Sequence, residues 1–160
     1  MKGPRLPITP AIRALRAAGI TWEDCPYDWV EGGGTGEFAR QHGVNEHEVI
    51  KTLIMEDDTG APMIVLMHGD REVSTRNLAR ELGVRHVEPC APATAERHTG
   101  YRVGGTSPFG TRRPMPVYCQ DTIADLPHLY INGGKRGYIL RLAAADLLRL
   151  LQPRLLPIAQ

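Results

Sequence analysis

The stretch VIKTLIMEDDTGAPMIVLM, residues 49–67, sets the arrangement of the rest of the chain. Its first part, VIKTLIM, is rich in β-branched and long apolar side chains, and this composition favours a buried strand. Asp57-Asp58-Thr59-Gly60 supplies turn-forming residues, and residues 62–67 are a second apolar run of the same kind. The stretch therefore predicts an antiparallel hairpin of two strands.

Shorter elements flank this hairpin on both sides. Helices are predicted where a capping residue or proline precedes an apolar stripe, over residues 10–18, 37–42, 75–82, 92–98 and 143–152, with Thr9 and Thr35 as caps of the first two. Short strands are predicted over residues 22–29, 85–88, 115–120, 129–132 and 138–142. The order predicts an α+β fold in a single domain, residues 1–160 with a core of about 9–152. Its many short strands favour a compact mixed β-barrel-like sheet with surrounding helices.

The composition is that of an ordinary globular protein. The chain has 160 residues, of which 42% are hydrophobic and 23% are charged, and its formal net charge is +1. Such a balance gives no global basic field, so we expect no DNA partner, and any RNA contact has to rest on a local patch.

Cysteine usage and the N-terminus indicate the compartment. The three cysteines are widely spaced and form no CxxC pair, which is typical of a reducing environment and excludes a zinc knuckle. The N-terminal residues show no apolar leader, and no run approaches the length of a membrane span. We therefore expect a cytoplasmic protein that contacts no membrane. The six histidines show no metal-ligand spacing, so no metal is expected.

Lys51 is the unusual residue of the first strand. Because side chains alternate along a strand, Val49, Lys51 and Leu53 share one face, while Thr52 lies on the other. A lysine inside an apolar strand either extends its ammonium group to solvent or meets an acceptor in a cavity. The residues alone leave both interpretations open.

Two glycine-rich segments have the composition of ligand-binding loops. TGYRVGGTSPFG, residues 99–110, lacks the Lys and Ser/Thr of a phosphate-binding P-loop, and no strand–glycine–helix unit surrounds it. It is either a surface turn or a group of backbone amides that holds an oxygen atom. GGKRG, residues 133–137, combines free amides with two cations, so it is either a hairpin turn or a phosphate contact. Cys25 is a possible nucleophile, but a buried thiol is the commoner role of such a residue.

These segments fall in a familiar order. The segments TPAIRALRAAGI, VIKTLI, HTGYRVGGTSPFG and YINGGKRGYILRLAAADLLRLL closely resemble the YbaK-type Cys-tRNA(Pro) deacylases, free-standing relatives of the editing domain of bacterial prolyl-tRNA synthetases. The resemblance spans about residues 9–151. It implies trans-editing, in which the ester between a mischarged amino acid and the 3′-terminal adenosine of tRNA is cleaved. The implied partner is the 3′ end of an aminoacyl-tRNA, with prolyl-tRNA synthetase as a further expected partner, and no cofactor is implied.

The resemblance also implies roles for particular residues. Lys51 and Gly104 match catalytic positions, at which a lysine faces the 3′ end and a loop amide stabilises the developing oxyanion. In Cys-selective members the substrate's own thiol attacks its carbonyl, which explains why no protein nucleophile is visible. The expected substrate-binding positions are Tyr27, Thr52, Gly105, Thr106, Ser107, Pro108, Gly133, Gly134, Lys135 and Arg136.

The chain departs from the family pattern at two places. Ile139 stands where a family member has an aspartate. The position of an aromatic residue usually found between Tyr27 and Lys51 falls near Gly34, so the aromatic side chain is missing there. Both differences bear on amino-acid preference. The leading hypothesis is a Cys-tRNA(Pro) deacylase. The alternatives are a deacylase that removes another small residue, such as Ala, by water attack, a non-catalytic tRNA-end binder, and a Cys25-dependent thiol hydrolase.

Overall fold

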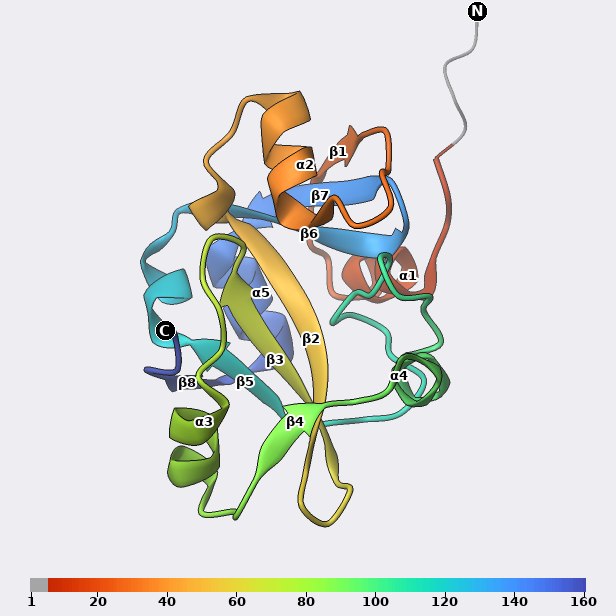
Figure 1. Ribbon diagram of the computed structural model, residues 1–160. Coiled ribbons are helices and arrows are strands. Elements are labelled where there is room, and N and C mark those ends of the chain that lie inside the picture. The colour runs from red at the N-terminus through yellow and green to blue at the C-terminus, as the bar shows by residue number, and fades with distance from the viewer. Residues whose placement is uncertain (1–5) are drawn as a thin grey trace, which may run out of the picture.

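The computed structural model describes residues 6–160, shown in Figure 1. The helices are α1 (Pro10–Ala17), α2 (Gly34–His42), α3 (Thr75–Leu82), α4 (Pro92–Thr99) and α5 (Ala144–Leu151), with 3-10 turns η1 (Glu46–Glu48) and η2 (Asp121–Asp125). The strands are β1 (Glu23–Pro26), β2 (Val49–Asp57), β3 (Pro62–His68), β4 (Val87–Pro89), β5 (Val117–Gln120), β6 (His128–Lys135), β7 (Tyr138–Ala143) and β8 (Arg154–Leu156).

All strands belong to one mixed, 8-stranded sheet with the order β1-β7-β6-β2-β3-β5-β8, and β4 lies beside β2. The predicted hairpin is the antiparallel pair β2–β3, in which Ile50 faces His68 and Glu56 faces Pro62. The prediction of a single domain with a mixed sheet and surrounding helices is confirmed (Figure 1). Over the described residues, the strand path ends at β1 and β8 and does not close into a complete barrel.

The core follows the alternation predicted for β2. Ile50 and Ile54 pack in the largest apolar cluster, together with residues of α1 and α5. Leu53 and Met55 lie on the opposite face, against α3 and the C-terminal residues. Val49 lies on that second face and packs against residues of α2, β1 and β7.

Two local predictions need correction, and one strand was not predicted. The strand predicted over residues 22–29 ends at Pro26, because its partner β7 begins at Tyr138, the residue opposite Pro26. Thr35 does not cap α2, because the helix begins at Gly34 and the Thr35 hydroxyl donates to the Glu46 carboxylate at 2.7 Å. The proline-flanked segment of β8 was not predicted, since three residues carry too little periodicity.

The edge of β2 that faces away from β3 is only partly paired. It pairs with β6 at Val49 and Ile50 and with β4 from Met55 to Asp57, so residues 51–54 have no strand partner there. The Gly69 N–H donates to the Val49 carbonyl at 2.6 Å, which fixes the alternation of backbone groups along the hairpin. The backbone groups of Thr52 and Ile54 are therefore directed away from β3, toward the open edge. The Cys90 N–H donates to the Ile54 carbonyl at 3.0 Å on that edge, as this alternation requires.

None of the helices between residues 6 and 160 has the length and apolar character that a membrane span requires.

Candidate functional site

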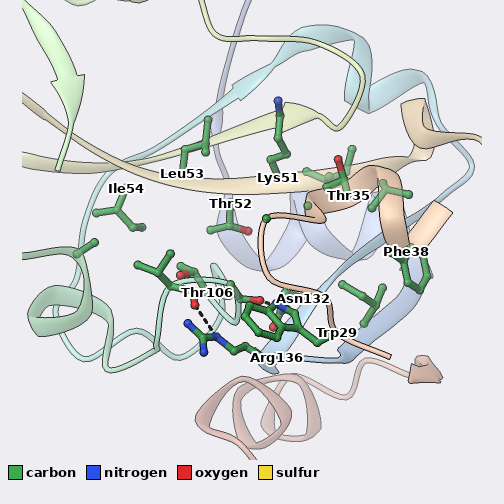
Figure 2. Close-up of a pocket in the computed structure, with 18 of the residues that line it drawn as sticks. Trp29, Thr35, Phe38, Lys51, Thr52, Leu53, Ile54, Thr106, Asn132 and Arg136 are labelled. Atoms are coloured by element: carbon green, nitrogen blue, oxygen red, sulfur yellow. Dashed lines mark hydrogen bonds between the residues drawn. The ribbon is translucent and has the colours of Figure 1, made fainter. Parts of the chain in front are cut away.

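A cavity of about 630 Å³ lies at the open edge of β2 (Figure 2). Residues 51–54 form one side of it, and the segment from Tyr27 to Thr35, which leads into α2, contributes another. A cavity of this size suits a ligand as large as an aminoacylated nucleoside. The remaining sides come from Phe38, Cys90, Ala95, Val103, Gly104, Thr106, Asn132, Arg136 and Ile139, among others.

Thr52 lines this cavity and carries a hydroxyl group without a partner. Its Oγ1 is buried and has no hydrogen-bond partner. Figure 2 shows the side chain directed toward Thr106 and Asn132. A buried polar group without a partner costs about 1–3 kcal/mol, so a ligand that hydrogen-bonds to Thr52 recovers part of that cost. Thr52 is therefore suited to contact a polar ligand.

Lys51 lines the cavity, but its ammonium group lies on the other side of the strand. The Nζ donates to Glu72 Oε1 at 3.2 Å, and the side chain is 19% exposed against 77% for Glu72. Figure 2 shows the Lys51 side chain directed away from Thr52 and Arg136. An ion pair with so exposed a carboxylate contributes little to stability and exchanges readily. The catalytic role of Lys51 stays a prediction, and it requires the ammonium group to leave Glu72 and to move to the cavity side of the strand.

Gly104 supplies an accessible amide at the cavity wall. Its φ is +91°, a conformation that favours glycine, and the residue is exposed. A Cβ built on it lies 3.1 Å from both Trp29 Nε1 and Arg136 Nε. Its carbonyl accepts a hydrogen bond from Asn132 Nδ2 at 3.3 Å. Over residues 6–160 its N–H donates to no protein acceptor, so it is free to bind an oxygen atom.

Gly105 differs from its neighbour in this respect. Its N–H donates to the Arg102 carbonyl at 2.8 Å, so that amide is occupied within the loop. A Cβ at this position lies 2.7 Å from the Arg136 backbone nitrogen. The expected group of ligand-binding amides therefore does not include that of Gly105, which serves close packing, whereas the Gly104 N–H is free.

Several other predicted contact residues lie behind the cavity wall. Ser107 is fully buried and accepts a hydrogen bond from the Phe109 N–H at 3.2 Å. Gly133 and Gly134 allow close packing, since a Cβ on them lies 2.9 Å from the Tyr138 ring and 2.8 Å from the Tyr101 ring. These residues, with the buried Pro108 and the exposed Lys135, do not line the cavity. Their expected substrate contacts remain predictions, and the structure gives the buried ones a packing role.

Trp29 and Arg136 close one end of the cavity. The Arg136 guanidinium carbon lies 4.2 Å from the centre of the Trp29 ring, a cation–π contact. Arg136 Nε also donates to the Val103 carbonyl at 2.9 Å. The pair therefore joins the segment before α2, the loop after α4 and the turn between β6 and β7 (Figure 2). Sequence reasoning selected Arg136 and missed Trp29, whose signal was its position just before the EGGGTG loop.

Asn132 is a second residue that sequence reasoning missed. Its Oδ1 accepts hydrogen bonds from the Gly134 N–H at 2.6 Å and the Lys135 N–H at 3.1 Å. Its amide nitrogen reaches Gly104, as described above. Asn132 thus connects the two glycine-rich segments, and its place directly before the glycine pair was the available signal.

The aromatic character expected near Gly34 is supplied from other positions. Phe38 is 1% exposed and meets Tyr27 edge to face at 5.3 Å between ring centres. Burial raises the pKa of Tyr27, and the nearby Glu37 charge adds to this. Ile139 packs beside Phe38, so this part of the cavity is apolar where the family pattern has a carboxylate.

The cysteines are poorly suited to nucleophilic attack. Cys90 lines the cavity, and burial with the nearby Glu56 and Glu88 charges raises its pKa. Burial also raises the pKa of Cys25, which does not line the cavity. A raised pKa leaves little thiolate at neutral pH. Within the described part of the chain, no three His, Cys, Asp or Glu side chains are grouped to hold a metal ion.

A family model described as the aminoacyl-tRNA editing domain matches residues 33–150, well over half of the chain. The chain therefore belongs to the aminoacyl-tRNA editing domain family.

Individual proteins are similar to this chain in sequence or in fold. The chain is 27% identical over 143 residues to EbsC of Enterococcus faecalis, described as a candidate Cys-tRNA(Pro)/Cys-tRNA(Cys) deacylase, covering 89% of this chain and 87% of EbsC. It is 27% identical over 86 residues to a proline–tRNA ligase of Brachyspira hyodysenteriae, covering 54% of this chain and 15% of that enzyme. A crystal structure described as a candidate trans-editing enzyme for prolyl-tRNA synthetase superposes with a TM-score of 0.83 at 20% identity, covering 96% of this chain and 99% of the other.

Proposed function

We propose that this chain is a trans-editing aminoacyl-tRNA deacylase that removes Cys from mischarged tRNA(Pro). The observation that carries the proposal is the free Gly104 amide on a cavity whose opposite side is the open edge of β2. Membership of the editing-domain family and the similarity to EbsC supply the substrate class.

Orientation and charge stabilisation account for most of the catalysis. An aminoacyl ester is already activated, so holding it and stabilising the oxyanion are sufficient tasks for the protein. The Gly104 N–H donates to the carbonyl oxygen as negative charge develops there. Lys51 exchanges Glu72 for an oxygen of the 3′ end, and Thr52 hydrogen-bonds to the substrate. Arg136 and Trp29 hold the wall to which Gly104 belongs.

The nucleophile is the thiol of the substrate cysteine. Its sulfur forms a bond to the carbonyl carbon, the bond from that carbon to the 3′ oxygen breaks, and the thiol proton passes to the 3′ oxygen. The products are a four-membered thiolactone and a tRNA with a free 3′ hydroxyl. This step uses no protein nucleophile, which is consistent with the raised pKa values of Cys25 and Cys90.

The first alternative is a deacylase that removes another small residue, such as Ala, by water attack. Ile139 favours it, because an apolar contact in place of a carboxylate suits a methyl side chain. The second alternative is a non-catalytic module that binds the tRNA end.

The test is to charge tRNA(Pro) with Cys, Ala, Ser and Pro and to measure loss of each ester. We expect loss of Cys alone, strong reduction in Lys51→Ala, and full activity in Cys25→Ala as the matched control. Cys alkylated on sulfur after charging should be stable, because it has no attacking thiol. Release of the alkylated residue at the same rate as unmodified Cys indicates water attack. Full activity of Lys51→Ala would contradict the catalytic role of Lys51.

The partner is tested separately. We propose that prolyl-tRNA synthetase directs the chain to its tRNA, since a net charge of +1 gives weak affinity for RNA on its own. Adding the synthetase should accelerate deacylation of Cys-tRNA(Pro) and leave Cys-tRNA(Cys) unchanged. Equal rates on both substrates with the synthetase present contradict this partner.

A further inference from the structure

Four exposed arginines surround the end of α4 and the loop that follows it. They are Arg97, Arg102, Arg112 and Arg113, hereafter the arginine surface. Arg97 lies in the last turn of α4, and the other three belong to the loop between α4 and β5. None of them is among the expected site residues or lines the cavity.

Backbone contacts bring these arginines together. The Arg112 N–H donates to the Thr99 carbonyl at 3.1 Å, and the Arg113 N–H donates to the His98 carbonyl at 2.9 Å. The far end of the loop is thereby fixed against the end of α4. Burial lowers the pKa of His98, and the charges of Arg113 and Arg97 lower it further, while the Glu56 charge raises it.

The arginine surface carries an excess of positive charge. No acidic residue occurs between Arg97 and Gln120, although the whole chain has a net charge of only +1. One carboxylate borders it, that of Glu96, which accepts a hydrogen bond from the Val103 N–H at 3.2 Å. None of these arginines forms an ion pair with any residue in the range 6–160. A concentration of free guanidinium groups on an otherwise balanced protein is typical of a phosphate-binding surface.

The arginine surface is continuous with the cavity. Ala95, two residues before Arg97, lines the cavity from α4. Val103 and Gly104, directly after Arg102, line it from the loop. Figure 1 shows α4 and its following loop beside the open edge of β2. The cavity and the arginine surface therefore share α4 and the loop that follows it.

We propose that the arginine surface binds the phosphates of the single-stranded 3′ end of an RNA whose terminal ester occupies the cavity. The identity of that RNA as an aminoacyl-tRNA rests on the proposed function. Charge complementarity identifies the occupant, since phosphate oxygens are the acceptors that unpaired guanidinium groups bind most strongly. The arginines position the single-stranded RNA, and the cavity binds its aminoacyl group.

The first experiment measures binding of uncharged tRNA by fluorescence anisotropy between 50 and 200 mM salt. Each phosphate contact to a single strand contributes about 0.7 to the slope of log affinity against log salt. Arg102→Ala/Arg113→Ala should therefore lower that slope by about 1.4. Over this fourfold salt range, the wild type should lose about sevenfold more affinity than the double variant does.

The matched control removes the same charge elsewhere. Arg76 and Arg80 are exposed on α3, on the other side of β4 from α4 (Figure 1). Arg76→Ala/Arg80→Ala should keep the wild-type slope. Equal slopes for all three proteins, or equal losses in both double variants, overturn the proposal. The first of these results points instead to an acidic protein as the occupant.

A second experiment separates this inference from the proposed function. The arginine variant should raise KM for Cys-tRNA(Pro) but leave the release of Cys esterified to adenosine alone unchanged, because that substrate carries no phosphate. Loss of activity on both substrates overturns the phosphate role. A wild type that deacylates nothing overturns the proposed function, while the salt slope with uncharged tRNA still tests the arginine surface.

Discussion

Replacement of Thr52 by valine should stabilise the protein and impair its function. The Thr52 hydroxyl is buried without a partner, and valine has nearly the same shape without the oxygen. Removing an unpaired polar group recovers part of a desolvation cost of about 1–3 kcal/mol. We expect the free energy of unfolding to rise by about 1–2 kcal/mol, and Tm to rise by about 2–8 °C for a chain of this length.

Thr99 provides the matched control. Its hydroxyl is equally buried, but it donates to the Ala95 carbonyl at 2.9 Å and accepts from the Tyr101 N–H at 3.0 Å. Thr99→Val leaves the Tyr101 N–H without its acceptor inside the protein, so it should lower the free energy of unfolding by about 1–3 kcal/mol. The same chemical change therefore has opposite signs at the two positions.

Urea unfolding with equal m-values is the appropriate assay, because a change of midpoint then reports stability alone. Deacylation of Cys-tRNA(Pro) is measured in parallel, and Thr52→Val should raise KM or lower kcat. A Thr52→Val variant that loses more than about 1 kcal/mol would falsify the reasoning, since the hydroxyl must then have a partner in the folded protein. Unchanged kinetics would remove Thr52 from the substrate site.

Two further predictions concern the loop and a buried imidazole. Gly104→Ala places a Cβ 3.1 Å from Arg136 Nε in a conformation that disfavours side chains. Deacylation should therefore fall at least tenfold, with a Tm loss of only a few degrees. Turnover at the wild-type rate would mean that the loop has only a structural role. Burial lowers the pKa of His68, whose ring contacts the His47 carbonyl and the Thr122 hydroxyl, so the folded state disfavours its protonation. Stability from His68 is therefore present above the usual imidazole pKa of about 6.5 and is lost as pH falls below it. Urea midpoints from pH 8 to 5 should fall more steeply for the wild type than for His68→Asn, and parallel curves would refute this.

Local patterns predicted the elements well and long-range pairing poorly. The hairpin of β2 and β3 followed from composition and turn residues within one stretch of 19 residues, 49–67. Thr9 was correctly predicted as the cap of α1, because capping depends on neighbours in sequence. The partner of the Thr35 hydroxyl, Glu46, is set by how α2 packs, so capping rules gave a wrong answer there.

The site shows the same limit more sharply. Lys51 and Thr52 are adjacent in sequence, and the alternation of side chains already required that they lie on opposite faces. The resemblance nevertheless placed both in one substrate pocket. Both line the cavity because it lies at an unpaired edge of the strand rather than on one face of the sheet. That edge is open for two reasons. β6 pairs with β2 only at Val49 and Ile50, and its register becomes irregular after Asn132. β4 pairs with β2 only near the other end, from Met55 to Asp57. Pairing lengths of this kind depend on the whole sheet. The glycine loop and the Trp29–Arg136 pair then occupy the space that a longer β6 would fill, which is why the residues that close the cavity come from segments distant in sequence.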